Sequence, residues 1–149
     1  MSIQEEAGLI LKLYDLRRED TMREARDWYF REFNPQSMDD FTAAMFSEHS
    51  GHLRMVITYW DMAAGLVNSG AISRDLFLTT NTEHIGVFSK IEPVLKDIRA
   101  GMAPQFAVNL EKLIDATPDG RKQCAIARER MKEIRAQLAK RPAMAAKQG

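Results

Sequence analysis

Residues 53–67, LRMVITYWDMAAGLV, form the most hydrophobic stretch of the chain. Apolar side chains recur there at intervals of three and four residues, which places them on one face of an α-helix. A stripe this wide is typical of a helix covered by other helices, so the sequence predicts a central helix that ends near Gly70. The stripe consists of Leu53, Val56, Ile57, Trp60, Ala63, Ala64 and Val67.

Helix boundaries are marked on both sides of this stretch. Ser2–Glu5 and Thr21–Glu24 have the spacing of capping boxes, in which a hydroxyl and a carboxylate satisfy the first amides of a helix. Asn34-Pro35 should end the second helix, because the residue before proline disfavours the α conformation. Further helices are expected after Ser37, after Ser73, over 83–99 with a kink at Pro93, after Pro104, and over 119–140.

Composition favours one globular helical domain. The 149 residues are 45% hydrophobic and 28% charged, ordinary values for a folded protein. No segment combines the residues and the length typical of a β-strand. We therefore predict an all-α fold, a single compact multi-helix bundle of about six to eight helices with a long C-terminal amphipathic helix. Residues 1–140 would form this domain and residues 141–149 a disordered tail.

Cysteine usage and the N-terminus bear on the compartment. The single cysteine, Cys124, cannot form an internal disulfide, which favours a reducing compartment and excludes multi-cysteine metal sites. Glu5 and Glu6 stand where a signal peptide carries positive charges. No apolar run reaches the roughly 18 residues that a transmembrane helix needs, so no membrane span is predicted. We expect a cytoplasmic protein.

The charges of the chain are divided unevenly, although they sum to zero. Residues 1–120 hold 12 Lys/Arg against 19 Asp/Glu, a net charge of −7. Residues 121–149 hold nine Lys/Arg against two Glu, a net charge of +7. Such an asymmetry bears on the choice of partner, because an acidic body and a basic helix attract each other.

The predicted C-terminal helix carries an apolar seam with spacings of three, four, three and four residues. We predict that this seam is buried against the acidic body, either of the same subunit or of a partner in a homodimer. A non-catalytic interaction module that self-associates, or that binds another protein, is the function this favours. The seam consists of Cys124, Ala127, Met131, Ile134 and Leu138.

The same helix supports an alternative function, binding of nucleic acid through residues 121–141. Lysine and arginine side chains there could contact phosphates. Against this reading, the body is acidic and the isoelectric point of the chain, about 6.8, is far from that of a typical nucleic-acid-binding domain. The basic residues concerned are Arg121, Lys122, Arg128, Arg130, Lys132, Arg135, Lys140 and Arg141.

Three histidines are candidates for metal or surface roles. His49 and His52 lie three residues apart beside Glu48, a spacing that metal sites use, but a third and fourth ligand are not evident. Gly51 lies between them, and we expect Ser50-Gly51 to interrupt the helix. A polar corner between helices is therefore the preferred interpretation, with no metal and no cofactor. His84 follows Thr82 and is expected on the surface of a first helical turn.

Asp61 is the carboxylate most suited to function, because it lies within the apolar stretch where an unpaired charge is costly to bury. An enzyme or small-ligand binder that uses Asp61 is a third alternative. The preferred interpretation is structural: Asp61 lies at the edge of the stripe or pairs with an arginine. No phosphate-binding glycine loop, nucleophile elbow or zinc-binding helix motif occurs, so a catalytic role is not predicted.

Several short segments resemble an uncharacterised bacterial helical family, the domain of unknown function 4760. They are Arg23-Glu24-Ala25-Arg26, Tyr59-Trp60-Asp61, Gly70-Ala71-Ile72-Ser73 and Ile91-Glu92-Pro93 before Arg99. The resemblance spans residues 23–99, about half of the chain. It implies a helical fold and transfers no catalytic residue, because the family has no assigned activity.

Overall fold

The chain folds as a succession of helices, and the computed structural model describes residues 2–140. In chain order the elements are α1 (Ile3–Arg17), α2 (Asp20–Arg31), α3 (Met38–Met45), α4 (Ser50–Asn68), α5 (Arg74–Thr80), α6 (Glu83–Ile91), the 3-10 turn η1 (Glu92–Val94), α7 (Leu95–Gly101), α8 (Val108–Ala116) and α9 (Gly120–Ala139). No strand occurs within these residues. Counted with α6, η1 and α7 as one bent helix, the described part holds eight helices, which confirms the predicted all-α class. The predicted tail over 141–149 lies outside the described residues.

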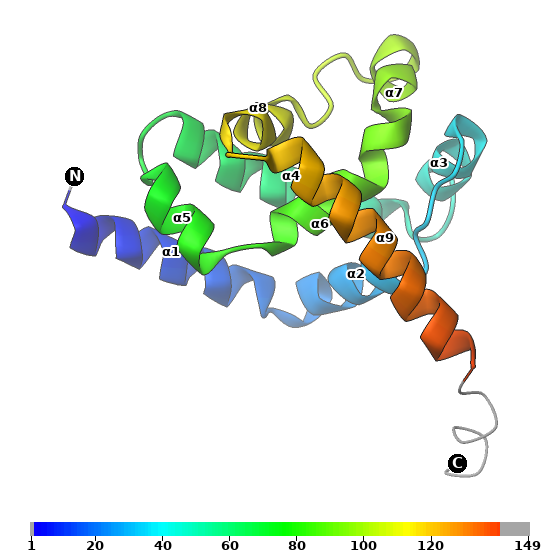
Figure 1. The fold of residues 1–149 in the computed structure, drawn as a ribbon, viewed down its shortest axis with the longest axis horizontal. Coiled ribbons are helices and arrows are strands. Elements are labelled where there is room, and N and C mark those ends of the chain that lie inside the picture. Colours follow the sequence, from blue (N-terminus) through cyan, green and yellow to red (C-terminus); the bar gives the residue numbers. More distant parts are fainter. Residues whose placement is uncertain (1, 141–149) are drawn as a thin grey trace.

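Helix α4 is the centre of the fold, as its apolar stripe predicts. Every residue of the stripe is buried, and Trp60 is only 1% exposed. Helices α2 and α8 pack most extensively against α4, while α3, α5 and α6 add further contacts. Figure 1 shows α1 and α2 along one side of this arrangement and α9 crossing in front of α6. The helix ends at Asn68, and Gly70, two residues later, has the expected left-handed conformation with a φ of 90°.

Most helix boundaries follow the local signals in the sequence. The capping box of α1 is confirmed, because Ser2 Oγ accepts from the Glu5 amide at 3.2 Å and Glu5 Oε1 accepts from the Ser2 amide at 3.3 Å. The capping box expected at Thr21 is wrong. Glu19 caps α2 instead, accepting from the Thr21 amide at 3.4 Å. Pro93 divides the helix over 83–99 through η1, as predicted.

Two other expected boundaries differ from the structure. Ser50-Gly51 begins α4 and does not interrupt a helix, because α3 has already ended at Met45. Pro104 was expected in a first helical turn, but α8 begins only at Val108. The residue before it, Ala107, has a left-handed φ of 55°, so the chain turns sharply into α8.

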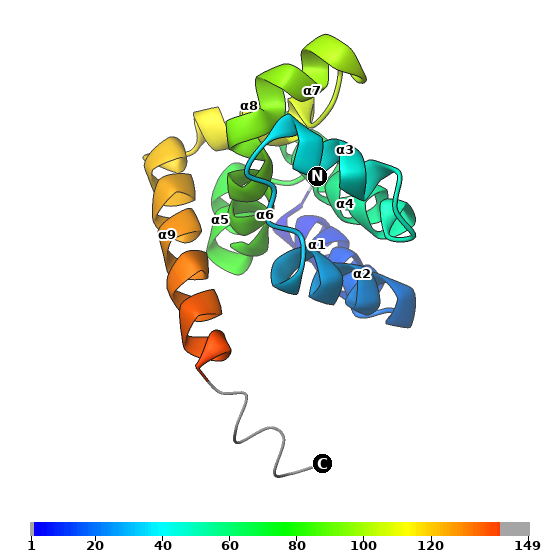
Figure 2. The same cartoon turned by 90° about the vertical axis from the view of Figure 1, so that its right-hand side faces the viewer.

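Of the two predicted ways to bury the seam of α9, packing against the body of the same subunit covers only its first part. Cys124 is fully buried, whereas Ala127 and Met131 are half-buried. Ile134 and Leu138 are exposed at 57% and 51%. Figures 1 and 2 give the reason: the first half of α9 lies along the body, and its second half extends past it. The seam is longer than the surface that one body offers.

No helix in the described part of the chain has both the length and the apolar character that a membrane crossing requires.

Candidate functional site

Helix α9 starts in direct contact with the end of α8. Asp119 has a left-handed φ of 56°, which turns the chain back on itself, and Gly120 is the first residue of the helix. A Cβ atom on Gly120 would lie 2.0 Å from the backbone oxygen of Ile114. Only glycine therefore permits this close approach, which fixes the direction in which α9 leaves the body.

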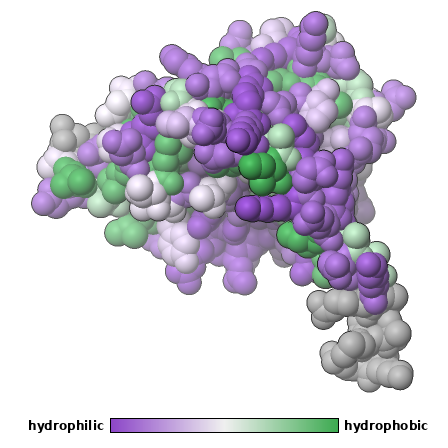
Figure 3. All heavy atoms as spheres, in the orientation of Figure 1, coloured by the Kyte–Doolittle hydropathy of each residue, from purple (hydrophilic) through white to green (hydrophobic). Residues whose placement is uncertain are grey.

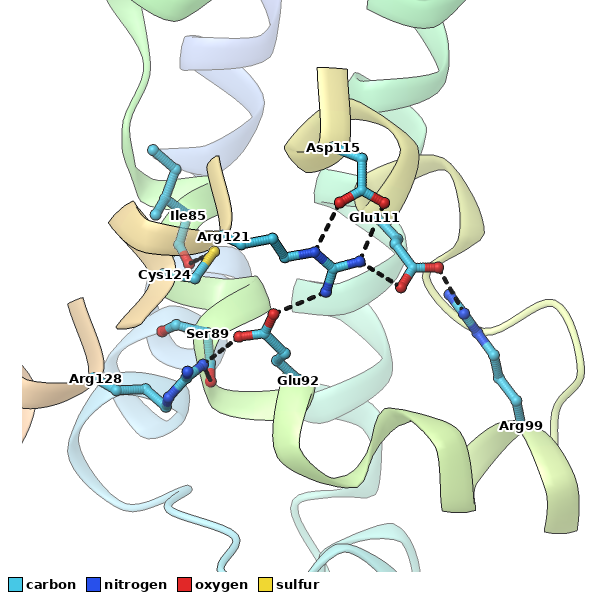
Figure 4. A network of polar contacts seen from close by, with 9 residues as sticks. All are labelled: Ile85, Ser89, Glu92, Arg99, Glu111, Asp115, Arg121, Cys124 and Arg128. Atoms are coloured by element: carbon cyan, nitrogen blue, oxygen red, sulfur yellow. Dashed lines mark hydrogen bonds and ion pairs between the residues drawn. The ribbon is translucent and has the colours of Figure 1, made fainter. Parts of the chain in front are cut away.

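One arginine joins the start of α9 to three carboxylates of the body. The Arg121 guanidinium donates to Asp115 and to Glu92, both at 2.7 Å, and to Glu111 at 2.8 Å. Figure 4 shows these carboxylates converging on it from α8 and from the turn after α6. The three carboxylates raise the pKa of Arg121 above its ordinary range. This half-exposed cluster orients α9, although individual exposed pairs add only about 0–1 kcal/mol.

The network continues on both sides of Arg121. The second oxygen of Glu92 accepts from Arg128, which also donates to the backbone oxygen of Ser89 at 3.1 Å. Glu111 also accepts from Arg99 at 2.7 Å. Arg121 and Arg128, two of the cations considered for phosphate contact, are thus already neutralised by carboxylates of the body.

Cys124 lies beneath this network as a packed core residue. Its Sγ is 3.9 Å from the backbone oxygen of Ile85. Burial, helped by the nearby Glu92, raises the pKa of Cys124 to about 11. A thiol with a raised pKa is a poor nucleophile near neutral pH, so Cys124 serves packing.

Beyond Cys124 the seam borders an open apolar groove. The groove has a volume of about 610 Å³ and runs between α6 and α9, with Phe30 of α2 at one side. Ile85, Ile126, Ala127 and Met131 contribute apolar surface to it. Figure 3 shows hydrophobic patches beside the course of α9 in an otherwise largely hydrophilic face. Further along the same helix Ile134 and Leu138 are exposed, so the seam continues past the groove as uncovered apolar surface.

The histidine pair at the start of α4 packs against an aromatic ring. His49 stacks on Trp28 with ring centroids 5.1 Å apart, and the His52 ring lies 5.6 Å from that of His49. The nearest carboxylate oxygen to His49 Nε2 belongs to Glu48, at 3.5 Å. Within residues 2–140, no three His, Cys, Asp or Glu side chains are grouped as metal ligands would be. The arrangement is a polar corner between α2 and α4.

Asp61 caps a helix from outside that helix. Its Oδ1 accepts from the Leu110 amide at 2.9 Å, and its Oδ2 accepts from Asn109 Nδ2 at 3.1 Å. Leu110 is the third residue of α8, whose own N-cap, Ala107, has no side chain able to accept a hydrogen bond. Asp61 therefore supplies the cap that α8 lacks, and its negative charge faces the positive end of the helix. Of the two structural alternatives, Asp61 lies half-buried at the edge of the stripe, and its partner is a helix N-terminus and not an arginine.

His84, expected on the surface, is fully buried, which corrects that prediction. Its ring lies between those of Phe77 and Trp60, with centroids 5.1 and 6.1 Å away. Neither ring nitrogen has a hydrogen-bond partner among the described residues. This burial lowers the pKa of His84 to about 4.

The buried His84 predicts a loss of stability in mild acid. The unfolded chain, with an ordinary histidine pKa of 6.5, binds a proton that the folded chain does not. Stability is therefore lost as the pH falls from 6.5 towards 4, by about 2 kcal/mol at pH 5 for this group. Urea unfolding at pH 8 and pH 5 measures it, and His84→Leu should reduce the difference between the two pH values. An unchanged difference in His84→Leu would show that other groups cause the acid sensitivity.

Lys90 is the second buried polar residue that the sequence did not reveal. It is only 6% exposed, and its Nζ donates to the backbone oxygens of Tyr29 at 2.8 Å, Phe30 at 3.1 Å and Phe33 at 2.7 Å. These oxygens lie at the C-terminal end of α2, where carbonyl groups have no partner within the helix. Burial, and repulsion by Arg135, lower the pKa of Lys90 to about 7. In the sequence, the only indication that Lys90 is buried was its position among the apolar residues of α6.

A family model described as "Domain of unknown function (DUF4760)" matches residues 2–117, most of the chain. This confirms the resemblance inferred from residues 23–99 and extends it to α1 and α8. Helix α9 lies beyond the matched residues. No curated protein and no solved structure matches the chain.

Proposed function

Because the chain belongs to the DUF4760 family, for which no activity is described, we propose its function from the geometry of α9. The protein is a non-catalytic helical interaction module that self-associates through the second half of this helix. The observation that carries the proposal is the exposure of Ile134 and Leu138, four residues apart on the seam of α9.

The exposed half of α9 favours a partner on physical grounds. An isolated helical segment of this length is marginally stable in water, and most helical stability in proteins comes from packing of an apolar face. Covering a side chain such as Ile134 or Leu138 is worth roughly 1.5–3 kcal/mol when it is fully removed from water. Both residues line a separate hollow on α9, the helix that also borders the apolar groove beside α6.

Charge favours a second copy of the chain as that partner. The chain combines an acidic part, residues 1–120 with a net charge of −7, and a basic segment, residues 121–149 with +7. Two copies can bring these opposite charges together, which steers association and fixes its register. Arg121 and Arg128 already meet carboxylates of their own body, so they are less available to a phosphate backbone.

Ile134→Asp should convert a dimer into a monomer. A charge placed in the seam cannot be buried without a partner, so we expect dimer affinity to fall by at least about 100-fold. Sedimentation equilibrium should give twice the chain mass of 17.0 kDa for the unchanged protein and 17.0 kDa for the variant. The folded monomer should keep its stability, because Ile134 is already exposed in it.

Ala136→Asp is the matched control. Ala136 is an exposed position of the same helix outside the seam, so the new charge there should leave the dimer intact. Self-association through α9 would be refuted if the unchanged protein were monomeric at a concentration of about 100 µM. It would also be refuted if the unchanged protein, Ile134→Asp and Ala136→Asp all had the same mass in solution. Salt-sensitive binding of a DNA or RNA probe by such a monomer would instead favour the nucleic-acid alternative.

A further inference from the structure

A second, smaller cavity also borders α9, and it is distinct from the apolar groove. Its volume is about 180 Å³, and it is enclosed by the segment after α2, by α6 and η1, and by α9. Four cationic side chains line it, and no lining residue carries a carboxylate. The cations are Lys90, Arg128, Lys132 and Arg135, and the amides of Asn34 and Gln36 complete the polar part of its wall.

Two of these cations are not balanced by a negative charge. Arg128 pairs with Glu92, and Lys132 pairs with Glu129 at 3.2 Å. Lys90 and Arg135, in contrast, form no ion pair with a carboxylate anywhere in residues 2–140.

Lys90 and Arg135 converge on one neutral atom. Lys90 Nζ donates to Asn34 Oδ1 at 3.0 Å, and Arg135 Nη1 donates to the same oxygen at 2.7 Å. Lys90 comes from α6, Arg135 from α9 and Asn34 from the segment after α2, so three elements meet there. Backbone oxygens at the end of α2 also accept from Lys90, but no carboxylate balances the two positive charges, so they repel each other and an anion beside Arg135 would relieve that repulsion.

We propose that this cavity binds a compact oxyanion, namely phosphate or a phosphate monoester. Arginine offers a planar fork of donors that matches phosphate oxygens, and lysine adds a point charge. The volume suits one phosphate group and excludes a polymer backbone from the interior. Lys132 also lines the cavity, although its side chain is exposed and pairs with Glu129.

Titration with inorganic phosphate tests the site, with sodium chloride of equal ionic strength as the reference. We expect calorimetry to show saturable binding of one phosphate per chain and thermal melts to shift upwards with phosphate. Arg135→Gln should weaken binding at least about tenfold, since it removes one charge-assisted contact. Lys132→Gln should weaken it less, because that side chain is exposed.

Lys122→Gln is the control, since Lys122 is an exposed cation of α9 that does not line the cavity. Binding that is no stronger than that of chloride, or that is weakened equally by Lys122→Gln and Arg135→Gln, would overturn the proposal. The proposal would also be overturned if a single-stranded oligonucleotide bound and if Lys122→Gln and Arg135→Gln weakened that binding equally. Such a result would indicate a diffuse basic surface.

A second measurement reports on the cavity directly. The pKa of Lys90, followed by NMR of ¹³C-labelled lysine, should rise when phosphate is added to the unchanged protein, and it should not rise in Arg135→Gln. If phosphate binding were saturable but the pKa of Lys90 did not change, the anion would bind outside this cavity. Phosphate binding is independent of self-association, because Ile134 does not line the cavity and Ile134→Asp should leave the phosphate affinity unchanged.

Discussion

Gly120→Ala should lower the free energy of unfolding by about 3 kcal/mol, a large effect for the addition of one methyl group. The new Cβ would lie 2.0 Å from the backbone oxygen of Ile114, and that oxygen cannot rotate away as a side chain could. Relief requires α8 and α9 to separate. Such a movement would pull Arg121 away from Asp115 and Glu111, so the ion network should weaken as well.

Gly8→Ala is the matched control for this prediction, because it makes the same chemical change inside α1 where nothing lies within 4 Å. Alanine is the better helix former by about 0.5–1 kcal/mol, so this variant should be slightly stabilised. Urea unfolding measures the change in the free energy of unfolding, which should be negative for Gly120→Ala and positive for Gly8→Ala. Equal stabilities for Gly120→Ala and the unchanged protein would mean that α8 and α9 do not meet as closely as described.

The central helix could be predicted from the sequence because its signal is both periodic and continuous. The stripe from Leu53 to Val67 repeats through several turns, and a helix so apolar has to be covered. Caps such as Ser2 with Glu5 were equally readable, because their hydrogen bonds join residues three apart. Where the signal is local, the sequence predicts structure well.

The buried polar residues could not be predicted because their partners are distant in the sequence. Lys90 bonds to oxygens about sixty residues earlier, and Asp61 caps a helix that begins nearly fifty residues later. Periodicity reports which face of a helix is apolar, and it does not report which carbonyl groups a neighbouring helix leaves without partners. His84 shows the same limit, since only the packing of Phe77 and Trp60 around it decides its burial.

The seam of α9 illustrates a related limit. Its spacing established that Cys124, Met131 and Ile134 share one face, and it could not establish where the body ends. Burial depends on the length of the surface opposite, which is a property of the folded body. The sequence left open whether the same subunit or a partner covers Ile134 and Leu138, and the folded body shows that the same subunit leaves them exposed.

Lys90→Met should destabilise the protein by about 3–5 kcal/mol, as expected when three buried backbone oxygens lose the donor that they share. Methionine fills a similar volume but donates no hydrogen bond, so the backbone oxygens of Tyr29, Phe30 and Phe33 would remain buried without it. Removal of the buried charge offsets part of this cost, because desolvation disfavours the ammonium group. The loss of several hydrogen bonds at once is the larger effect, since each unsatisfied buried acceptor costs about 1–3 kcal/mol.

Lys96→Met is the matched control for Lys90→Met, because it also removes a lysine charge but removes no buried hydrogen bonds. Lys96 is exposed on α7, so its replacement should change the free energy of unfolding by no more than about 0.5 kcal/mol. Urea unfolding gives both values, and hydrogen exchange should show faster opening at the end of α2 in Lys90→Met. A Lys90→Met protein as stable as Lys96→Met would mean that water or neighbouring groups satisfy the α2 carbonyls. The lysine would then serve the cavity beside Arg135 and would not hold α2 in place, because its bonds to the helix would contribute no net stability.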